Sequence, residues 1–475
     1  MDKRVRITVE DLSEPLLIPA DAYISKDYAE AEADRLWAKV WQQAGRVEEI
    51  SEVGSFITYE ICNDSILIVR SAPDTIKAFH NVCTHRGRRL VSTPRGAHSA
   101  AGKQKKFVCG YHAWTFDTTG KATYILDKSD WKGQLTEMCT NLREVKVDTW
   151  GGWIFINMDP DCEPLREFLE PVASLLDPFE FEQMRYRFRA WGIFDCNWKV
   201  ALEAFLEPYH VAGTHPQLTK YGDFYAWSRA LGRHGHDGYD TKEHKTAGQD
   251  VAADTSVHRA AKGEDARIST AQMQQEFWDT VGAATTETLV KAAQRLVDEL
   301  PAGTPAAEVH HHWLESARRD DAERGVIWPD ISDKQMSDAG LAQSIFPNMN
   351  FLPGPTFLLY YRVRPYGTDP DKCIYEAIAL DRFPPGQQPQ TEWQFLEQDP
   401  DRWPYVIGQD ISNMIEVQKG LKSRGFAGNL PNPWQERKVS NLHRNLAEYM
   451  GMGEPQLLES ALLESELPAS ELRGQ

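Results

Sequence analysis

The chain has no excess of basic charge and no long apolar run. Its 475 residues include 52 Lys and Arg against 70 Asp and Glu, which gives a formal net charge of −18. Nucleic-acid-binding proteins carry a basic surface, so this balance argues against nucleic acid as a partner. No stretch reaches the roughly 20 apolar residues of a membrane-spanning helix, and residues 1–15 lack the apolar core of a signal peptide. We therefore expect a cytoplasmic protein that binds neither nucleic acid nor membrane.

Cysteine is scarce, and its number is odd. Seven cysteines in a large chain without a secretion signal make a poor disulfide framework. Most of them are expected to be small buried apolar residues. Cys83 and Cys109 differ from the others, because each is followed within three residues by a histidine.

The hydrophobic pattern divides the chain into three parts. A chain of this length is expected to hold two or three core regions. Residues 1–45 have apolar positions at helical spacing, and residues 46–160 contain short β-rich segments separated by turn residues. Residues 161–475 mix helices and strands, and within them the polar segment 221–343 is expected to be an insertion-like region.

Several elements of the third part can be predicted individually. The segments TFLLYYRVRPYG (356–367) and KCIYEAIALDRF (372–383) are typical of two strands joined by a Gly- and Asp-bearing turn. Helical spacing predicts helices in 285–300, 405–425 and 441–451.

The first candidate metal site is Cys83-Thr-His85 together with Cys109-Gly-Tyr-His112. Two thiolates and two imidazoles could hold one tetrahedral zinc, or a [2Fe-2S] cluster with cysteines on one iron and histidines on the other. Zinc sites commonly pair like ligands in one knuckle, whereas each of these loops mixes Cys with His. The pattern favours the cluster and leaves zinc as the alternative.

The second candidate site is the stretch FLEPYHVAGTHP, which contains Glu207, His210 and His215. Positions five apart on a straight helix point about 140° away from each other. We predict that Gly213 ends the helix in a left-handed conformation, so that His215 comes from the following turn. Two histidines and a carboxylate are a common set for an iron that activates O₂. Taken alone, the stretch also fits an acid–base site or a structural helix end.

Three segments resemble one known family. CTHRGRRL (83–90) and CGYHAWTFDTTG (109–120) resemble the Rieske signature of ring-hydroxylating Rieske-type non-haem iron oxygenases, in their α (large) subunit. NWKVALEAFLEPYHVAGTH (197–215) resembles the catalytic segment of the same family. The resemblance implies an α+β protein with a Rieske all-β domain at 46–160. It also implies a helix-covered antiparallel-sheet catalytic domain (SRPBCC or helix-grip type) at 161–475, against which the helical segment 1–45 packs.

The resemblance also implies the ligands of both metal centres. A [2Fe-2S] cluster would be held by Cys83, His85, Cys109 and His112. A mononuclear Fe(II) would be held by His210, His215 and Asp410 in GQDISNMIEVQKGL. The other candidates for its third ligand are Asp399, Asp401 and Glu416.

Glu207 stands where the family has a carboxylate that bridges the iron of one subunit to a cluster histidine of its neighbour. The commoner residue there is Asp, so the longer Glu is a departure. The bridge requires a neighbouring subunit, and the resemblance implies a homotrimer, possibly with a small β subunit.

The implied activity is that of a terminal oxygenase. It would use O₂ and electrons from a ferredoxin and/or flavin reductase to mono- or dihydroxylate an aromatic or other small apolar substrate. Arg86, Arg88 and Arg89 supply positive charge beside the cluster motif, which could receive an acidic ferredoxin. The alternatives are an oxidative demethylase of the same family, a Rieske electron-transfer protein without an oxygenase site, and a zinc-stabilised binding protein.

Overall fold

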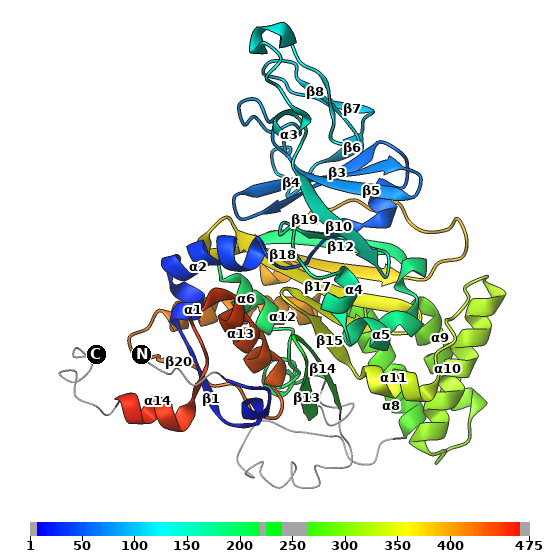
Figure 1. The fold of residues 1–475 in the computed structure, drawn as a ribbon. Helices are drawn as coiled ribbons and strands as arrows, with labels where there is room; N and C mark the ends of the chain where they lie inside the picture. Colours follow the sequence, from blue (N-terminus) through cyan, green and yellow to red (C-terminus); the bar gives the residue numbers. More distant parts are fainter. Residues whose placement is uncertain (1–6, 219–224, 240–264, 466–475) are drawn as a thin grey trace. The chain divides into compact units, whose positions relative to one another are not determined.

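The computed structural model describes residues 7–218, 225–239 and 265–465, and the chain forms two compact units (Figure 1). The smaller unit is Glu30–Glu170 with Tyr366–Thr368. The larger unit consists of three segments: Met1–Ala29, Pro171–Pro365 and Asp369–Gln475.

The smaller unit is built from two antiparallel sheets. The larger sheet has the order β2-β11-β10-β5-β4-β3-β6, and the second has the order β7-β8-β9. The strands of the first are β2 (Gln42–Arg46), β3 (Ser55–Ile61), β4 (Asp64–Ala72), β5 (Thr75–His80), β6 (Ala101–Lys103), β10 (Glu144–Trp150) and β11 (Trp153–Asn157). Those of the second are β7 (Lys106–Val108), β8 (Thr115–Asp117) and β9 (Ala122–Tyr124). Its helices are short: α3 (Glu137–Thr140) and α4 (Leu165–Leu169).

A glycine pair sets the register of the β10–β11 hairpin. Trp150 pairs with Trp153 across Gly151 and Gly152, whose φ angles are +56° and +83°. Two-residue hairpin loops with positive φ at both positions match the twist of the flanking strands, and glycine adopts them without strain. The β-rich segments predicted for this part of the chain are therefore strands, and the all-β prediction is confirmed.

The larger unit is centred on an eight-stranded sheet with the order β13-β14-β15-β16-β17-β18-β12-β19. Antiparallel pairing runs from β13 to β17 and joins β12 to β18, whereas β19 lies parallel to β12. The strands are β12 (Arg185–Phe194), β13 (Ala226–Leu231), β14 (His234–Tyr239), β15 (Ala342–Ile345), β16 (Met349–Pro353), β17 (Phe357–Tyr366), β18 (Asp369–Asp381) and β19 (Gln394–Phe395). A small sheet has β1 (Leu16–Pro19) between β20 (Gly428–Asn429) and β21 (Gln456–Leu457).

Helices cover this sheet, with α6 packed on β18 and α13 packed on β13 and β14 (Figure 1). The other α-helices in the described residues are α1 (Asp21–Ile24), α2 (Lys26–Glu32), α5 (Val172–Leu176), α6 (Trp198–Glu203), α7 (Val211–Thr214), α8 (Ala266–Glu276), α9 (Glu287–Glu299), α10 (Ala306–Glu323), α11 (Asp333–Ala339), α12 (Tyr405–Leu421), α13 (Arg437–Met450) and α14 (Leu458–Ser465). The predicted helices at α9, α12 and α13 are confirmed, and so are the neighbouring strands β17 and β18. The antiparallel sheet with its helices agrees with the α+β prediction.

Two regions contain more than the sequence pattern indicates. The N-terminal segment has the predicted helical turns but also β1 and β2, because a short apolar run such as LLIP fits a strand as well as a helix. The segment 221–343 supplies β13, β14 and part of β15 to the central sheet, and α8, α9 and α10 form a helical cluster with a core of its own. Residues 221–224 and 240–264 of that segment lie outside the described residues.

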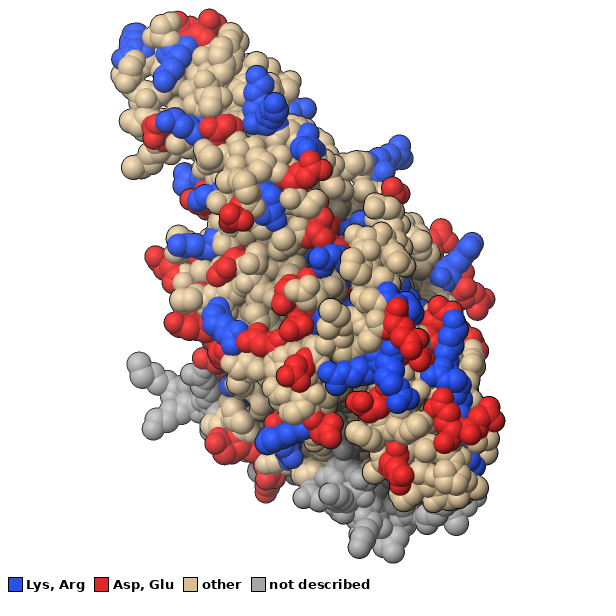
Figure 2. Space-filling model, turned by 90° about the vertical axis from the view of Figure 1, so that its right-hand side faces the viewer, with Lys and Arg blue, Asp and Glu red and all other residues tan. Residues whose placement is uncertain are grey.

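Two surface properties bear on the sequence expectations. On the face drawn in Figure 2, acidic and basic side chains are interspersed and do not gather into one basic surface. Within the described ranges, no helix combines the length and apolarity that a bilayer crossing needs.

Asp381 at the end of β18 leads to a pH prediction for stability. Burial raises the pKa of this carboxyl to about 7, although Arg187 opposes the shift. Because an unfolded aspartate has a pKa of about 3.9, the protonated carboxyl contributes stability that is complete below about pH 4. That contribution is lost as the pH rises through about 7, and its upper bound is about 4 kcal/mol at 1.4 kcal/mol per pKa unit. Asp381→Asn is therefore expected to gain stability over the wild type between pH 5 and pH 8.

Urea unfolding at several pH values measures this difference, with the exposed Asp401→Asn as control. Arg187 also donates a hydrogen bond to the Thr285 carbonyl and stacks on Trp278, contacts that do not involve Asp381. A stability difference that does not change with pH would contradict the prediction.

Candidate active site

The segment with the two histidines is a single helical turn between two breaks. Helix α6 starts at the Asn197 cap, whose side chain accepts a hydrogen bond from the backbone N–H of Lys199, and it ends at Glu203. After an irregular stretch, α7 begins with His210 as its N-cap and ends with His215 as its C-cap.

The predicted role of Gly213 is wrong. Gly213 lies inside α7 and is not among the glycines with positive φ. The helix is already interrupted ahead of His210, near Pro208, which has no N–H to donate. His215 leaves α7 with φ −119° and ψ 55°, and the following Pro216 disfavours a helical conformation for it. The two rings converge because one short turn separates them, and their centroids lie 5.2 Å apart.

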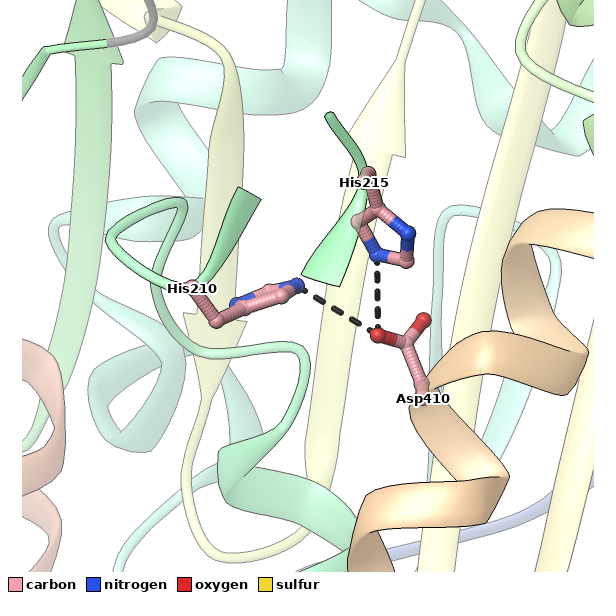
Figure 3. Close-up of side chains that lie close together, drawn as sticks. All are labelled: His210, His215 and Asp410. Atoms are coloured by element: carbon pink, nitrogen blue, oxygen red, sulfur yellow. Dashed lines mark ion pairs between the residues drawn. The ribbon is translucent and has the colours of Figure 1, made fainter. Parts of the chain in front are cut away.

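One carboxylate oxygen of Asp410, a residue of α12, faces both imidazoles (Figure 3). Its Oδ1 is 2.9 Å from Nε2 of His215 and 3.4 Å from Nε2 of His210. One donor atom from each of the three residues lies within 4.8 Å of the others. Asp410 and His215 are buried, whereas a quarter of the His210 side chain is exposed. Among the residues that the structure describes, this is the one compact group of three or more potential ligands.

Charge within the group favours a bound cation. Burial would raise the pKa of Asp410, but hydrogen bonds with the two histidines outweigh it and lower that pKa. Burial likewise opposes a charged His210, yet the carboxylates of Glu207 and Asp410 raise its pKa to about 10. Two imidazole nitrogens, a carboxylate oxygen and room for further ligands fit a mononuclear iron.

Each imidazole is held from behind by a different acceptor. Glu207 accepts hydrogen bonds from Nδ1 of His210 at 2.8 Å and from its backbone N–H at 2.9 Å. Nδ1 of His215 lies 2.9 Å from Oε1 of Gln409. With the ring proton on Nδ1, both Nε2 atoms present a lone pair toward the Asp410 side of the group, the arrangement that a metal requires.

A cavity of about 520 Å³ opens beside His210 and Asp410. Among the described residues that line it, four carry carboxylates and none is Lys or Arg. Burial, followed by the charge of Glu207, raises the pKa of Glu436 to about 7. Val417, Phe426 and Leu430, which also line it, are exposed. The cavity is therefore acidic with an apolar rim. Its carboxylates are Glu203, Glu207, Asp410 and Glu436.

Sequence reasoning missed two groups of polar residues around the site. The first is Gln409, the hydrogen-bond partner of His215. Its only sequence signal is that it precedes Asp410. Glu203 is the other: it accepts a hydrogen bond from Tyr23 at 3.0 Å and lies 2.6 Å from Nε2 of the buried His443. No local pattern could have joined these residues, because they lie far apart in the chain.

In the smaller unit, the two Cys-His loops share one backbone pattern. The N–H of Cys83 donates to the carbonyl of Arg88, and Gly87 donates back to Cys83. In the second loop the N–H of Cys109 donates to Trp114, and Ala113 donates back to Cys109. The residue four positions after each cysteine has a positive φ, +74° for Gly87 and +60° for Ala113. The loops are equivalent turns, although the histidine stands one position later in the second.

The four predicted ligands lie at the tips of these turns. The cysteines are buried at 2% and 3% exposure, whereas the histidines are partly exposed, with ring centroids 4.6 Å apart. Trp114 stacks on His85 at 4.8 Å. Burial raises the pKa of Cys83. Burial acts the same way on Cys109, but the backbone N–H groups of Tyr111 and His112 outweigh it and lower its pKa. Two inner thiols and two outer imidazoles fit a Rieske [2Fe-2S] cluster.

The shared turn predicts opposite effects at its two left-handed positions. Gly87→Ala adds a Cβ where φ is positive and is expected to cost about 1 kcal/mol of loop stability. Ala113→Gly removes the same strain and is expected to be neutral or slightly stabilising. The temperature at which the cluster absorbance is lost measures both. Gly303→Ala carries similar strain in the larger unit and is the control; equal temperatures for Gly87→Ala and wild type would refute this reading.

Two family models match the chain. The model "Rieske [2Fe-2S] domain" matches residues 40–132, which include all four candidate cluster ligands. The model "Ring hydroxylating alpha subunit (catalytic domain)" matches residues 180–452, more than half of the chain. The cofactors of these two domains are a [2Fe-2S] cluster and a mononuclear iron.

Curated relatives are oxygenase subunits. The glycine betaine monooxygenase oxygenase subunit of Pseudomonas aeruginosa is 30% identical over 203 residues, which cover 43% of this chain and 46% of the relative. The carnitine monooxygenase oxygenase subunit of Escherichia coli (strain K12) is 30% identical over 202 residues, which cover 42% of this chain and 52% of the relative. The matches thus span about half the length of these relatives.

Solved structures share the fold. The quaternary ammonium Rieske monooxygenase CntA in complex with L-carnitine gives a TM-score of 0.61 at 17% identity, covering 94% of this chain and 99% of the other. Naphthalene 1,2-dioxygenase with bound indole gives 0.62 at 17% identity, covering 92% and 93%. With a Rieske domain and a matching catalytic domain in one chain, the protein belongs to the family of ring-hydroxylating alpha subunits.

Proposed function

We propose that this chain is a terminal oxygenase that holds a mononuclear iron with His210, His215 and Asp410. The observation that carries the proposal is the convergence of these donor atoms within 4.8 Å, in a chain that also has a Rieske domain. The cluster ligands in this proposal are Cys83, His85, Cys109 and His112.

The residues of the site have distinct tasks. A bound iron supplies the O₂ chemistry, with electrons that the cluster receives from a ferredoxin and/or flavin reductase. Glu207 and Gln409 orient the two imidazoles, and burial keeps bulk water from His215 and Asp410. Because His210 is partly exposed, one side of the proposed iron-binding group is open to solvent.

Glu207 is proposed to connect the two kinds of centre across a pair of chains. It contacts His210 and lines the acidic cavity, whose apolar rim suits a protein surface. The cluster loops carry exposed Arg86, Arg88 and Arg89 beside their partly exposed histidines. The opposite charges favour docking of the cluster loops of a second copy at this cavity, in keeping with a homotrimer.

The substrate is proposed to be a small organic molecule that contacts an aromatic surface. Phe205 is half-buried and stacks on Tyr361 at 3.8 Å. Burial, followed by the charge of Asp410, raises the pKa of Tyr361 well above its usual range. The aromatic pair therefore lies close enough to the proposed iron ligand Asp410 to interact with its charge. A flat aromatic or apolar substrate could stack there.

A quaternary ammonium compound is the second candidate substrate. The relatives named for glycine betaine and carnitine favour it, and aromatic faces attract such cations. Hydroxylation of a carbon bonded to the nitrogen would cleave that C–N bond.

A substrate panel tests the proposed function. The protein, with both centres loaded and a ferredoxin–reductase pair, is supplied with aromatic hydrocarbons and with quaternary ammonium compounds. We expect a product that gains one or two oxygen atoms or loses CH₂, and no product from His210→Ala. A purified protein whose cluster exchanges electrons normally but which binds no mononuclear iron would overturn the proposal.

A further inference from the structure

Gln409 lies in α12 directly before Asp410 and contacts the other nitrogen of an imidazole that Asp410 also contacts, that of His215. Its side-chain oxygen lies 2.9 Å from Nδ1 of His215, 194 positions away in the sequence. From this contact we infer that Gln409 is a positioning residue that sets the tautomer of His215, an inference that rests on the proposed function. It acts through His215 and does not belong to the metal-binding group itself.

The orientation of the Gln409 amide is fixed by a second contact. Its Oε1 also accepts a hydrogen bond from Nε2 of Gln217 at 2.7 Å, and its own Nε2 lies 3.5 Å from Oε1 of Gln217. Two donors thus converge on one carbonyl oxygen. A reversed amide would lose both hydrogen bonds, so Gln217 keeps the oxygen of Gln409 directed at the imidazole.

The carbonyl decides where the ring proton of His215 resides. In the neutral imidazole that binds a metal, an acceptor at Nδ1 requires the proton there and leaves Nε2 with a lone pair. Nε2 is the atom that lies 2.9 Å from Asp410, on the side of the proposed iron. A donor at Nδ1 would shift the proton to Nε2 and block that position. Gln409 therefore selects the tautomer that can bind a metal.

The two proposed histidine ligands differ in the charge of their acceptors. His210 donates to the carboxylate of Glu207, whereas His215 donates to a neutral amide. The neutral amide of Gln409 orients the His215 ring without adding a second negative charge beside the buried Asp410. The loop keeps another link to α12 that does not involve Gln409, a hydrogen bond from Asn413 to Oγ1 of Thr214 at 3.2 Å.

Metal binding by four variants tests the inference. Apo protein with an intact, oxidised cluster is dialysed against Co²⁺, and bound Co²⁺ is measured by metal analysis and by the EPR signal of the ion. Gln409→Leu removes the acceptor and is expected to weaken Co²⁺ binding about 10- to 100-fold. Gln409→Glu keeps an acceptor and is expected to restore affinity to near the wild-type value.

Asn413→Ala is the matched control, since it removes a hydrogen bond between the loop and α12 that does not involve Gln409. If Asn413→Ala binds Co²⁺ as tightly as the wild type while Gln409→Leu binds it weakly, the loss in Gln409→Leu comes from the missing acceptor at Nδ1 of His215. It does not come from a weaker attachment of the loop to α12. Wild-type affinity of Gln409→Leu, or equally weak binding by Gln409→Glu, would overturn the inference. His215→Ala separates the two proposals: if it loses Co²⁺ while Gln409→Leu does not, only the role of Gln409 fails.

Discussion

Asp410→Ala is expected to lose the mononuclear iron completely while keeping the [2Fe-2S] cluster. The carboxylate is the one anionic donor of the proposed ligand set, and its Oδ1 lies within 3.4 Å of both histidine Nε2 atoms. Without it, two neutral imidazoles remain, and turnover should fall to background. The candidate cluster ligands all belong to the smaller unit, so the cluster spectrum should not change.

Two further variants make this test specific. Asp401→Ala removes an exposed carboxylate in the neighbouring sequence, which was an alternative third ligand, and should keep iron and activity. Asp410→Asn preserves the shape of the side chain and should still lose most of the iron, because it removes the charge. Full iron content in Asp410→Asn and Asp410→Ala, measured by metal analysis, would show that the ligand is elsewhere.

Glu207→Gln is expected to keep both metal centres and to lower turnover by about 100-fold. The Gln side chain can still accept a hydrogen bond from His210, but it lacks the charge and the second equivalent oxygen. The cavity that it lines would also become less acidic for the arginines of the cluster loops. Stopped-flow oxidation of the reduced cluster, in the presence of O₂ and substrate, measures the step that should slow.

Glu207→Asp examines the length of the side chain. In this chain both oxygens of Glu207 bind His210, at 2.8 Å and 2.9 Å. A shorter Asp should lose one of these contacts, so its cluster oxidation rate should lie between those of the wild type and Glu207→Gln. A wild-type rate in Glu207→Gln, with both centres loaded, would exclude the proposed bridge.

The metal motifs were readable from sequence because their ligands are close together in the chain. Cys83 and His85 occupy one turn, Cys109 and His112 another, and mixed Cys-His loops favour a Rieske cluster over a zinc knuckle. Asp410 was predictable only through resemblance, since it comes from a separate helix. The structure brings it to His210 and His215, whereas the alternatives Asp399, Asp401 and Glu416 are not in the group.

Other features had no local signal. The hydrogen bond between His215 and Gln409 depends on how α12 packs, and helical periodicity does not contain that information. The predicted break at Gly213 is wrong, because the helix is already interrupted near Pro208, a local breaker that precedes His210. Strands β13 and β14 were hidden in a polar segment because they contain polar and charged residues even at buried positions, such as Ser228 and Asp237.

The most direct measurement is the iron and sulfide content of the purified chain. A [2Fe-2S] cluster with a mononuclear iron predicts three irons and two acid-labile sulfides per chain, since two irons belong to the cluster and one to the His210 site. Two irons with two sulfides would indicate an electron carrier without an oxygenase site. Zinc without sulfide would contradict both centres.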